Sequence, residues 1–369
     1  MRIDRPGLVL ALPGAAAMLL PFMQFRANRI VAGEALSMPG WAMACLGAVL
    51  ALGALRLPQL WRLLAAAFGI CLLVWLAGNV ATGLTADAPQ AARASPGSGL
   101  WLMMGTLALL VADAIAKMRP GLRVQALILT LACGAVALAL GSGHLADISV
   151  MREYAARSDI FAAHARRHLV LAFGSLLAAL MVGVPLGLWL HSERGARPAV
   201  MGGLNLVQTL PSLALFGMMI PLLSWVAASV PGAAALGIAG IGFAPALIAL
   251  FLYSLLPVVG NTVVGLDGAS PEAREAGRGM GMTPQQVLAR VSIPLALPVI
   301  VAAVRIVLVQ NIGLAVIAGL IGGGGFGTFV FQGLAQNAAD LILLGAIPTV
   351  AMALVAGIAL DLVVKALQR

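Results

Sequence analysis

The sequence predicts an all-α, polytopic helical membrane protein with about ten transmembrane helices. Three observations support this fold class. Hydrophobic residues make up 62% of the 369 residues, charged residues make up only 9%, and the mean hydropathy is +1.04. Water-soluble domains carry about 25% charged residues, so a soluble globule is excluded. Apolar runs of about 20 residues recur along the chain, and in lipid a helix satisfies its own backbone hydrogen bonds.

The first half of the chain is predicted to form five spans, which make up an N-terminal transmembrane extension over residues 1–145. Asp113 lies four residues before Lys117, and this spacing favours an i,i+4 ion pair near a span end over a proton relay. The segment 146–167 is mixed and polar, so we expect a periplasmic or interfacial linker that can lie on the membrane surface as a helix. The five apolar runs cover residues 7–24, 40–55, 63–84, 99–116 and 124–143.

The second half is predicted to form a core of five further spans over residues 168–369. Its polar stretch 270–298 separates the third of these spans from the fourth and is the only long charged run in this half. The chain therefore alternates between membrane and water, and this stretch is the largest loop of the core. The five apolar runs cover residues 168–190, 201–226, 241–263, 295–318 and 340–364.

The polar stretch carries the start and stop signals of two short helices. Ser270 with a proline behind it is typical of a helix N-cap, and Thr283 with a glutamine three residues later has the spacing of a capping box. Between them, three glycines make a continuous helix costly, and Gly281 stands where a left-handed residue is expected. We expect Pro294 and Pro298 to end the second helix.

The same stretch resembles the EAA loop of ABC importer permeases, whose pattern is E-A-A, three residues, G, nine residues and then I-x-L-P. Here Glu275-Ala276-Gly277 stands at the E-A-A, Gly281 is the glycine, and Val291-Ser292-Ile293-Pro294 closes the pattern with conservative departures. The resemblance implies that this loop, 270–294, couples the chain to a cytoplasmic ABC ATPase subunit. The residues implied for that coupling are Glu272, Glu275, Ala276, Gly277, Gly281 and Pro294.

From about residue 160 to 369 the chain is similar to the permease subunit of glycine betaine and related osmoprotectant importers. The motifs that carry the similarity include QTLPSLALFGMMIPLL, ALFLYSLLPVVGNTVVGL and LIGGGGFG. The resemblance implies the type I importer fold for the core, transport of quaternary amines, a periplasmic substrate-binding protein, and a second permease copy or paralogue. The N-terminal spans resemble the extension of long-chain variants. Gly260 stands directly before Asn261 and Thr262, at a position where relatives usually carry a basic residue. This departure weakens the case that these residues contact an anion.

Polar or helix-breaking residues within the predicted spans are candidates for a translocation path. Pro211 and Pro257 can unwind their helices and free carbonyls, although kinks that serve packing explain them nearly as well. Arg305 lies in an apolar run, where a charge needs a partner, a water-filled path or a snorkelling route to the interface. The candidates are Gln208, Thr209, Pro211, Ser212, Pro257, Asn261, Thr262, Arg305 and Asn311.

The sequence carries no signature of a catalytic, nucleotide or metal site. It has no Gly-Lys pair and hence no P-loop, so we expect no cofactor in this chain and a separate ATPase that uses ATP and Mg²⁺. Gly322–Gly327 formally matches a dinucleotide fingerprint, but no strand precedes it, and a turn in a re-entrant helix explains it better. The four histidines lack metal-ligand spacing, and the three cysteines lie in apolar runs as packing residues.

Charge counting gives the topology. If the loop 270–294 is cytoplasmic, about twice as many of the 22 Lys and Arg residues lie in cytoplasmic loops as in external ones, and both termini are cytoplasmic. We therefore expect a multi-pass protein of the bacterial inner membrane. The net charge of +9 follows from this bias, so membrane lipid and not nucleic acid is the expected contact.

Two other functions compete with an ABC permease. An ion-gradient-driven secondary transporter would be expected to place acidic residues at mid-membrane, whereas Asp113, Asp340 and Asp361 lie toward span ends. A membrane-embedded enzyme would need a catalytic cluster in its spans, and none is evident. Aromatic residues make up only 5% of the chain, so an aromatic cage for a quaternary amine is expected in another subunit.

Overall fold

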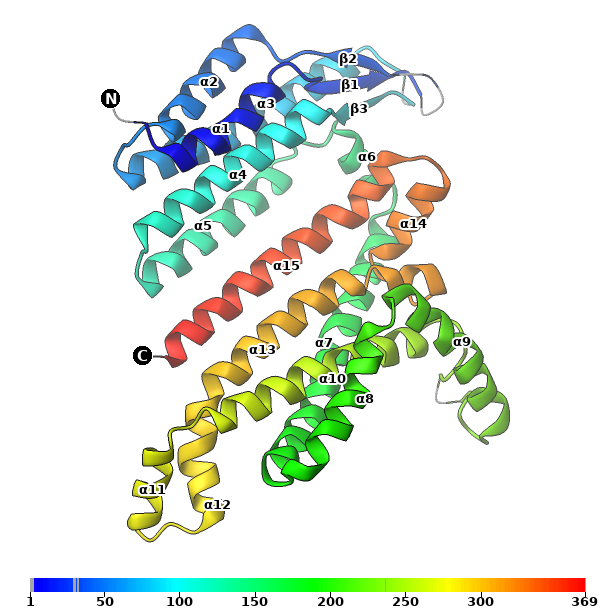
Figure 1. Cartoon of the computed structure of the whole chain (residues 1–369). Coiled ribbons are helices and arrows are strands. Elements are labelled where there is room, and N and C mark those ends of the chain that lie inside the picture. The colour runs from blue at the N-terminus through cyan, green and yellow to red at the C-terminus, as the bar shows by residue number, and fades with distance from the viewer. Residues whose placement is uncertain (1–2, 29–30, 32, 90, 236, 369) are drawn as a thin grey trace. The chain divides into compact units, whose positions relative to one another are not determined.

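The computed structural model describes residues 3–28, 31, 33–89, 91–235 and 237–368. The chain divides into two compact units, Met1–Ala156 and Arg157–Arg369, called unit 1 and unit 2 below. Both are built from helices, with one small sheet in unit 1 (Figure 1). The predicted helical membrane class is confirmed.

Unit 1 combines helices with a short antiparallel sheet, which lies at one end of α1, α3 and α4 (Figure 1). The strand order is β2-β1-β3, with Gln24 of the central strand opposite Ala35 on one side and Ser95 on the other. Helix α1 packs against α2 and α4, and α3 packs against α2 and α4. The elements are α1 (Arg5–Ala17), β1 (Met23–Arg26), β2 (Glu34–Leu36), α2 (Gly40–Ala54), α3 (Gln59–Thr85), β3 (Arg93–Pro96), α4 (Ser98–Met118), α5 (Leu122–Gly141) and α6 (Ser149–Ala156).

The first predicted span, 7–24, is too long. Helix α1 ends at Ala17, and after a turn the chain enters β1. Phe22 and Met23 are apolar because they are buried in unit 1, at 1% and 0% exposure, and not because they continue a membrane helix. The sheet was missed because β1 pairs with β3, and the helices α2 and α3 lie between them in the sequence.

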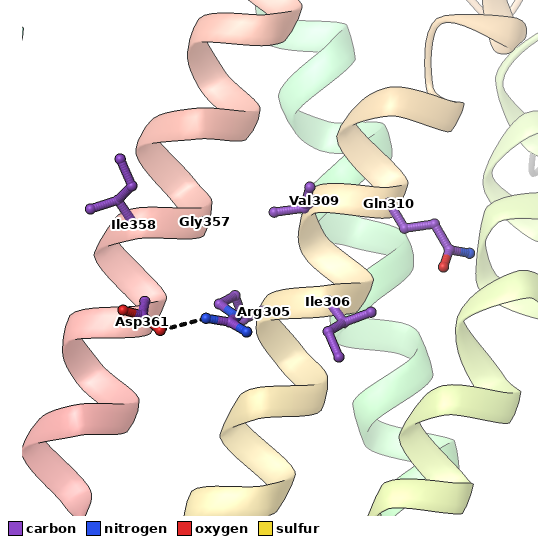
Figure 2. A pocket seen from close by; sticks show the side chains of 7 residues that line it. All are labelled: Arg305, Ile306, Val309, Gln310, Gly357, Ile358 and Asp361. Carbon is purple, nitrogen blue, oxygen red and sulfur yellow. Dashed lines mark hydrogen bonds and ion pairs between the residues drawn. The ribbon is translucent and has the colours of Figure 1, made fainter. Parts of the chain in front are cut away.

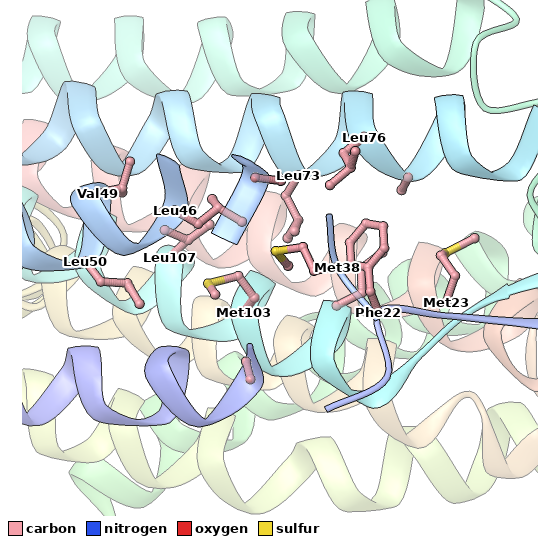
Figure 3. Packing of buried hydrophobic residues seen from close by; sticks show 14 of the residues in the cluster. Phe22, Met23, Met38, Leu46, Val49, Leu50, Leu73, Leu76, Met103 and Leu107 are labelled. Atoms are coloured by element: carbon pink, nitrogen blue, oxygen red, sulfur yellow. The ribbon is translucent and has the colours of Figure 1, made fainter. Parts of the chain in front are cut away.

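A continuous apolar core joins α1–α4 and the sheet. Figure 3 shows Phe22 and Met38 close to Leu73 of α3, with Met103 and Leu107 contributed by α4. In contrast, none of the residues of α5, all of which the structure describes, is buried within the chain. The apolar side chains of α5 are therefore left for lipid or for another protein surface.

Four charged side chains form a ring that ties α1, α3 and α4 together. Arg62, only 2% exposed, contacts Asp4 Oδ2 at 3.1 Å and Asp113 Oδ2 at 2.9 Å, and Lys117 Nζ contacts the same oxygens at 2.6 and 2.8 Å. Burial raises the pKa of Asp4, but hydrogen bonds and the two cations outweigh it and lower that pKa. The predicted pair between Asp113 and Lys117 is confirmed as one side of this ring.

Unit 2 is arranged around α10, which packs against α7, α8, α9 and α13. Figure 1 places α11 and α12 at the end of unit 2 opposite α14, and α15 runs from α14 back toward that end. The elements are α7 (Ser158–Ser192), η1 (Arg194–Ala196), α8 (Arg197–Thr209), α9 (Ser212–Ser229), α10 (Phe243–Asp267), α11 (Pro271–Gly279), α12 (Pro284–Val287), η2 (Leu288–Ser292), α13 (Ile293–Leu314), η3 (Ile317–Ile321), α14 (Gly327–Ala335) and α15 (Ala339–Leu367).

Two segments of the core differ from the prediction. The polar segment before the first core span does not form a separate surface helix up to residue 167, because α7 already begins at Ser158 and continues into the span. The predicted single span 201–226 is two helices, since the chain is extended at Leu210 and Pro211, with ψ of 133° at both residues. A proline disfavours helical backbone at the residue before it, which explains the break.

Eight helices in the described part of the chain are long and apolar enough to cross a membrane. They are α3, α4, α5, α7, α9, α10, the continuous helix Pro284–Leu314 and α15. The two other predicted spans correspond to α1 and α2, which have only 13 and 15 residues. A full crossing takes about 20 helical residues, so these two are the short members of the predicted ten.

Candidate functional site

The N-terminus of α11 is fixed by the predicted cap. Ser270 Oγ accepts a hydrogen bond from the Ala273 N–H at 3.1 Å, and Pro271 occupies the first helical position. Glu272 lies in the first turn, where the helix dipole favours a carboxylate. The loop therefore leaves α10 through a short helix whose start is specified by its own side chains.

The C-terminus of α11 is a Schellman motif centred on Gly281. The Gly281 N–H donates to the Arg278 carbonyl at 2.9 Å, and the Met282 N–H donates to the Gly277 carbonyl at 3.1 Å. The φ angle of Gly281 is +81°, as predicted for the left-handed position. A Cβ at Gly281 would meet no atom within 4 Å, so the backbone conformation and not the available space requires glycine.

Helix α12 begins with the predicted capping box. The Gln286 N–H donates to Thr283 Oγ1 at 3.3 Å, and the Thr283 N–H donates to Gln286 Oε1 at 2.9 Å. These reciprocal bonds satisfy two of the donors that a helix start leaves without partners. Together with the Schellman motif, they fix the angle at which the chain turns from α11 into α12.

The prediction that Pro294 and Pro298 end the second helix is wrong. The helix continues from α12 through the π-helical turn η2 into α13. In η2 the Ile293 N–H donates to the Leu288 carbonyl, five residues back. Pro294 stands directly after this wider turn, at the start of α13, and Pro298 lies inside α13. The loop is thus rigidly continuous with the span that follows it.

The two helices of the loop pack through Gly277, which is buried. A Cβ at this position would lie 3.4–3.5 Å from Val287, Met282 and Val291, which is ordinary contact distance. The other predicted coupling residues are exposed, and Glu272 and Glu275 share one face of α11 because they are three residues apart. The exposed members of the predicted set are Glu272, Glu275, Ala276, Gly281 and Pro294.

Gln208 and the two predicted helix-breaking prolines are linked by Tyr253, which sequence reasoning did not select. Pro257 has no N–H, so the Tyr253 carbonyl four residues before it lacks its helical donor, and Gln208 Nε2 donates to it at 2.7 Å. In return, Tyr253 Oη donates at 2.6 Å to the carbonyl of Leu210, directly before Pro211. The carbonyls of Tyr253 and Leu210 therefore both accept hydrogen bonds, and these bonds connect α8 with α10. The signal available in the sequence was the i,i+4 spacing of Tyr253 and Pro257.

Other candidates on these helices bond within their own helix. Thr209 Oγ1 donates to the Leu206 carbonyl at 2.8 Å, Asn261 Nδ2 to the Pro257 carbonyl at 2.8 Å, and Thr262 Oγ1 to the Val258 carbonyl at 2.7 Å. Thr262 is fully buried, whereas Thr209 is exposed and Ser212 lies half-buried at the start of α9. Within this chain, the geometry gives Thr262 a packing role.

Asn311 is the centre of a buried polar network. Its Nδ2 donates to Ser175 Oγ of α7 and to Ser254 Oγ of α10, both at 2.8 Å. The two hydroxyls donate to carbonyls one turn back in their own helices. All three side chains are 0% exposed, so this network joins α7, α10 and α13 within unit 2 and is closed to solvent.

Arg305 faces an open cavity between α13 and α15. Its Nη1 contacts Asp361 Oδ1 at 2.5 Å, as Figure 2 shows, and Lys365 Nζ contacts Asp361 Oδ2 at 2.7 Å. Arg305 therefore has a partner, which is one of the three alternatives expected for a charge in an apolar run. Asp361 and Arg305 are 56 residues apart in the chain, so sequence spacing alone does not identify them as a pair.

The glycine-rich turn before α14 is held by His168. The His168 ring lies between α13 and this turn, with Nε2 3.0 Å from the Ile312 carbonyl and Nδ1 accepting the Phe326 N–H at 3.3 Å. The preceding turn is left-handed at Gly322, Gly324 and Gly325. The described residues contain no cluster of three or more His, Cys, Asp or Glu able to hold a metal ion. The segment is a tight turn that His168 connects to α13.

Two family profiles match the chain. Residues 4–151 match the profile described as ABC transporter permease YehY, N-terminal domain. Residues 175–369 match the profile described as binding-protein-dependent transport system inner membrane component. The second match begins within α7 and covers the rest of the core, including the loop between α10 and α13.

Named relatives and solved structures agree with these matches. The osmoprotectant import permease protein OsmW of Salmonella typhimurium is 42% identical over 189 residues, 51% of this chain and 83% of the relative. The glycine betaine/carnitine/choline transport system permease protein OpuCB of Bacillus subtilis is 38% identical over 188 residues, 51% of this chain and 79% of the relative. A chain of the inward-facing MetNI methionine ABC transporter has a TM-score of 0.51 at 23% identity, and the match covers 57% of this chain and 97% of that chain.

Proposed function

Because the chain belongs to the binding-protein-dependent transport system inner membrane component family, we propose that it forms the membrane path of an ATP-driven importer and couples to its ATPase through residues 270–294. The observation that carries the coupling proposal is the geometry of this loop. Two capped helices, joined at Gly281 and continuous with α13, present Glu272 and Glu275 on an exposed face. A partner that binds this face would contact a helix pair whose second helix, α12, continues without a break into the membrane helix α13.

The proposed substrates are glycine betaine or related quaternary-amine osmoprotectants. Support comes from relatives whose names record osmoprotectant, glycine betaine, carnitine and choline transport, at 38–42% identity over about half of this chain. The chain supplies few aromatic residues for a tight cage, so the discriminating step is proposed to lie in a secreted substrate-binding protein.

The proposed assembly contains a cytoplasmic ABC ATPase, a periplasmic binding protein and a second permease copy or paralogue in the bacterial inner membrane. We assign the face that carries α11 and α12 to the cytoplasm. Since α15 runs toward that end of unit 2, the same assignment makes the C-terminus cytoplasmic (Figure 1). The excess of Lys and Arg in the loops on this side supports the orientation.

Reconstitution tests the function directly. The full chain is inserted into proteoliposomes with its ATPase and binding protein, and uptake of labelled glycine betaine is measured with ATP alone or with an imposed proton or sodium gradient alone. We expect uptake with ATP and none with either gradient. Uptake driven by a gradient in the absence of ATP would favour the secondary transporter instead.

A further inference from the structure

An apolar groove lies between α2 and α3 of unit 1, beside the loop that joins these two helices. Its volume is about 590 Å³. Each helix contributes one face to the groove, since residues at i, i+3 and i+7 share a side of a helix. The residues with this spacing are Cys45, Ala48 and Leu52 of α2 and Trp61, Leu64 and Phe68 of α3.

The groove opens away from the apolar core of unit 1. On the core side of α2, Leu46 and Leu50 are 0% and 5% exposed, and Figure 3 shows both among the core residues. On the groove side, Trp61 and Phe68 are 64% and 58% exposed. Membrane helices pack against one another through small residues that let their backbones approach. Bulky exposed walls therefore suit a flexible chain better than a second helix.

The groove fits within one leaflet of a membrane. From Cys45 to Leu52 the axis of α2 rises about 10 Å, and α3 rises as far from Trp61 to Phe68. The hydrocarbon of one leaflet is about 15 Å thick, half of the bilayer core. Leu57 and Trp61 lie at the loop end of the groove, and tryptophan is enriched at the boundary between hydrocarbon and water. The apolar lining therefore begins at the level of the lipid headgroups and continues into one leaflet.

Two arginines at the loop end of the groove have no carboxylate partner within the described residues. Arg56 is exposed and stands directly before Leu57, and its side chain makes no hydrogen bond or ion pair in the described part of the chain. The same holds for Arg5 at the start of α1. Ile3 and Leu55 form a β-bridge, which brings these two arginines to the same end of unit 1.

The acidic residues at this end do not neutralise the two arginines. Asp4 and Asp113 are both held by Arg62 and Lys117, in the ring of two carboxylates and two cations described above. The two arginines therefore give this end of unit 1 a net positive charge. The charge count places the same end on the cytoplasmic side of the membrane, where anionic lipids make the leaflet surface negative.

We propose that this groove binds one anionic phospholipid, with an acyl chain between α2 and α3 and the phosphate at Arg56. The Arg56 guanidinium offers a planar fork of donors suited to a phosphate. The indole N–H of Trp61, which bonds to none of the described residues, adds a donor at headgroup level. A zwitterionic lipid presents the same phosphate together with an ammonium, which the positive charge of Arg5 repels, so an anionic headgroup is preferred. This site needs neither ATPase nor substrate and goes beyond the proposed function.

The test titrates the delipidated full chain in detergent with dioleoyl phosphatidylglycerol, which is anionic, or with dioleoyl phosphatidylcholine, which is zwitterionic. Native mass spectrometry measures the bound lipid. An arginine near a membrane surface strengthens the binding of anionic lipid about fivefold. We expect the first phosphatidylglycerol to bind at least fivefold more tightly than phosphatidylcholine, and Arg56→Gln to reduce this preference at least threefold. Arg123→Gln is the matched control, because it removes the same charge at the start of α5, which lines no part of the groove, and it should keep the preference.

A second pair of variants tests the apolar part of the site. Ala48→Phe fills the groove from α2, whereas Ala51→Phe adds the same ring at an exposed position of the same helix outside the lining. Both alanines are exposed, so neither ring meets the core of unit 1. We expect Ala48→Phe to weaken the binding of phosphatidylglycerol at least fivefold and Ala51→Phe to change it by less than twofold.

Equal binding of the two lipids by the wild type, an equal preference in the two arginine variants, or equal binding by the two phenylalanine variants would overturn this inference. A second copy of the chain seated in the groove is the competing occupant. It would be revealed by a disulfide between two Cys45 residues in native membranes, with Cys71→Ser and Cys133→Ser in the same chain to remove the other cysteines. We expect no such cross-link, and its formation would assign the groove to an interface between copies.

Discussion

Gly281→Ala is the substitution that most directly tests the coupling loop. Gly281 has a φ of +81°, and a side chain in left-handed backbone costs about 1–2 kcal/mol. Nothing lies within 4 Å of the added Cβ, so no clash contributes. The whole effect therefore falls on the turn between α11 and α12. A penalty of this size reduces the population of the native turn relative to its alternatives by about 5- to 30-fold.

Gly277→Ala is the matched control, because it adds the same methyl group four residues earlier. Here the residue is helical, and the new Cβ would lie at ordinary contact distances of 3.4–3.5 Å from its neighbours. Alanine is favoured over glycine inside a helix by about 0.5–1 kcal/mol. The same added methyl group should therefore destabilise the loop at Gly281 and stabilise it at Gly277.

The assay is binding of the purified ATPase subunit to the full chain in nanodiscs, with membrane insertion measured in parallel. We expect Gly281→Ala, and more strongly Gly281→Asp, to insert normally and to weaken ATPase binding and uptake, by up to about 30-fold if docking requires the native turn. Gly277→Ala should bind at least as well as the wild type. Equal ATPase affinity in Gly281→Ala, Gly281→Asp and wild type would refute the reasoning.

Three mutations and one topology test follow from other sites. Glu275→Lys should insert at normal abundance yet co-purify poorly with the ATPase, since it reverses charge on the exposed face of α11; normal co-purification and uptake would contradict this. Tyr253→Phe removes the donor to a freed carbonyl and should lower stability by about 1–3 kcal/mol in thermal unfolding. Arg62→Met leaves two carboxylates with one cation and should lower the free energy of unfolding of unit 1 by about 3–5 kcal/mol, which faster hydrogen exchange in that unit would show. A reporter after Arg369 should be cytoplasmic and one near Ser95 external; the reverse result would invert the topology.

The geometry of the loop 270–294 was predictable because its determinants are local. A serine with a following proline, a capping box and a left-handed glycine each act over three to five residues, and all three are present at the expected positions. The exception is the end of the second helix. Proline normally breaks a helix, but here the helix continues into α13 through the π-helical turn at Leu288–Ser292, and sequence spacing alone does not reveal such a turn.

Features that depend on distant residues could not be predicted. The sheet of unit 1 pairs strands separated by two helices, and four-residue strands leave no clear alternation of polar and apolar residues. His168 carries no motif in the sequence, yet it is fully buried and holds a turn more than 150 residues away. Such partnerships follow from tertiary packing, which gives polar groups their partners only after the helices have assembled.

The hydrogen bonds around Pro211 and Pro257 reduce the number of candidates for a translocation path. Pro257 frees the Tyr253 carbonyl, but Gln208 bonds it, and Tyr253 in turn bonds the carbonyl before Pro211. A carbonyl that already has a donor offers less to a passing ligand, so a proline in a span does not by itself mark a path. Arg305 differs from these groups because it remains partly exposed to a cavity even with its partner in place. Arg305 is therefore the one charged side chain among the predicted path candidates, and it is accessible from a cavity.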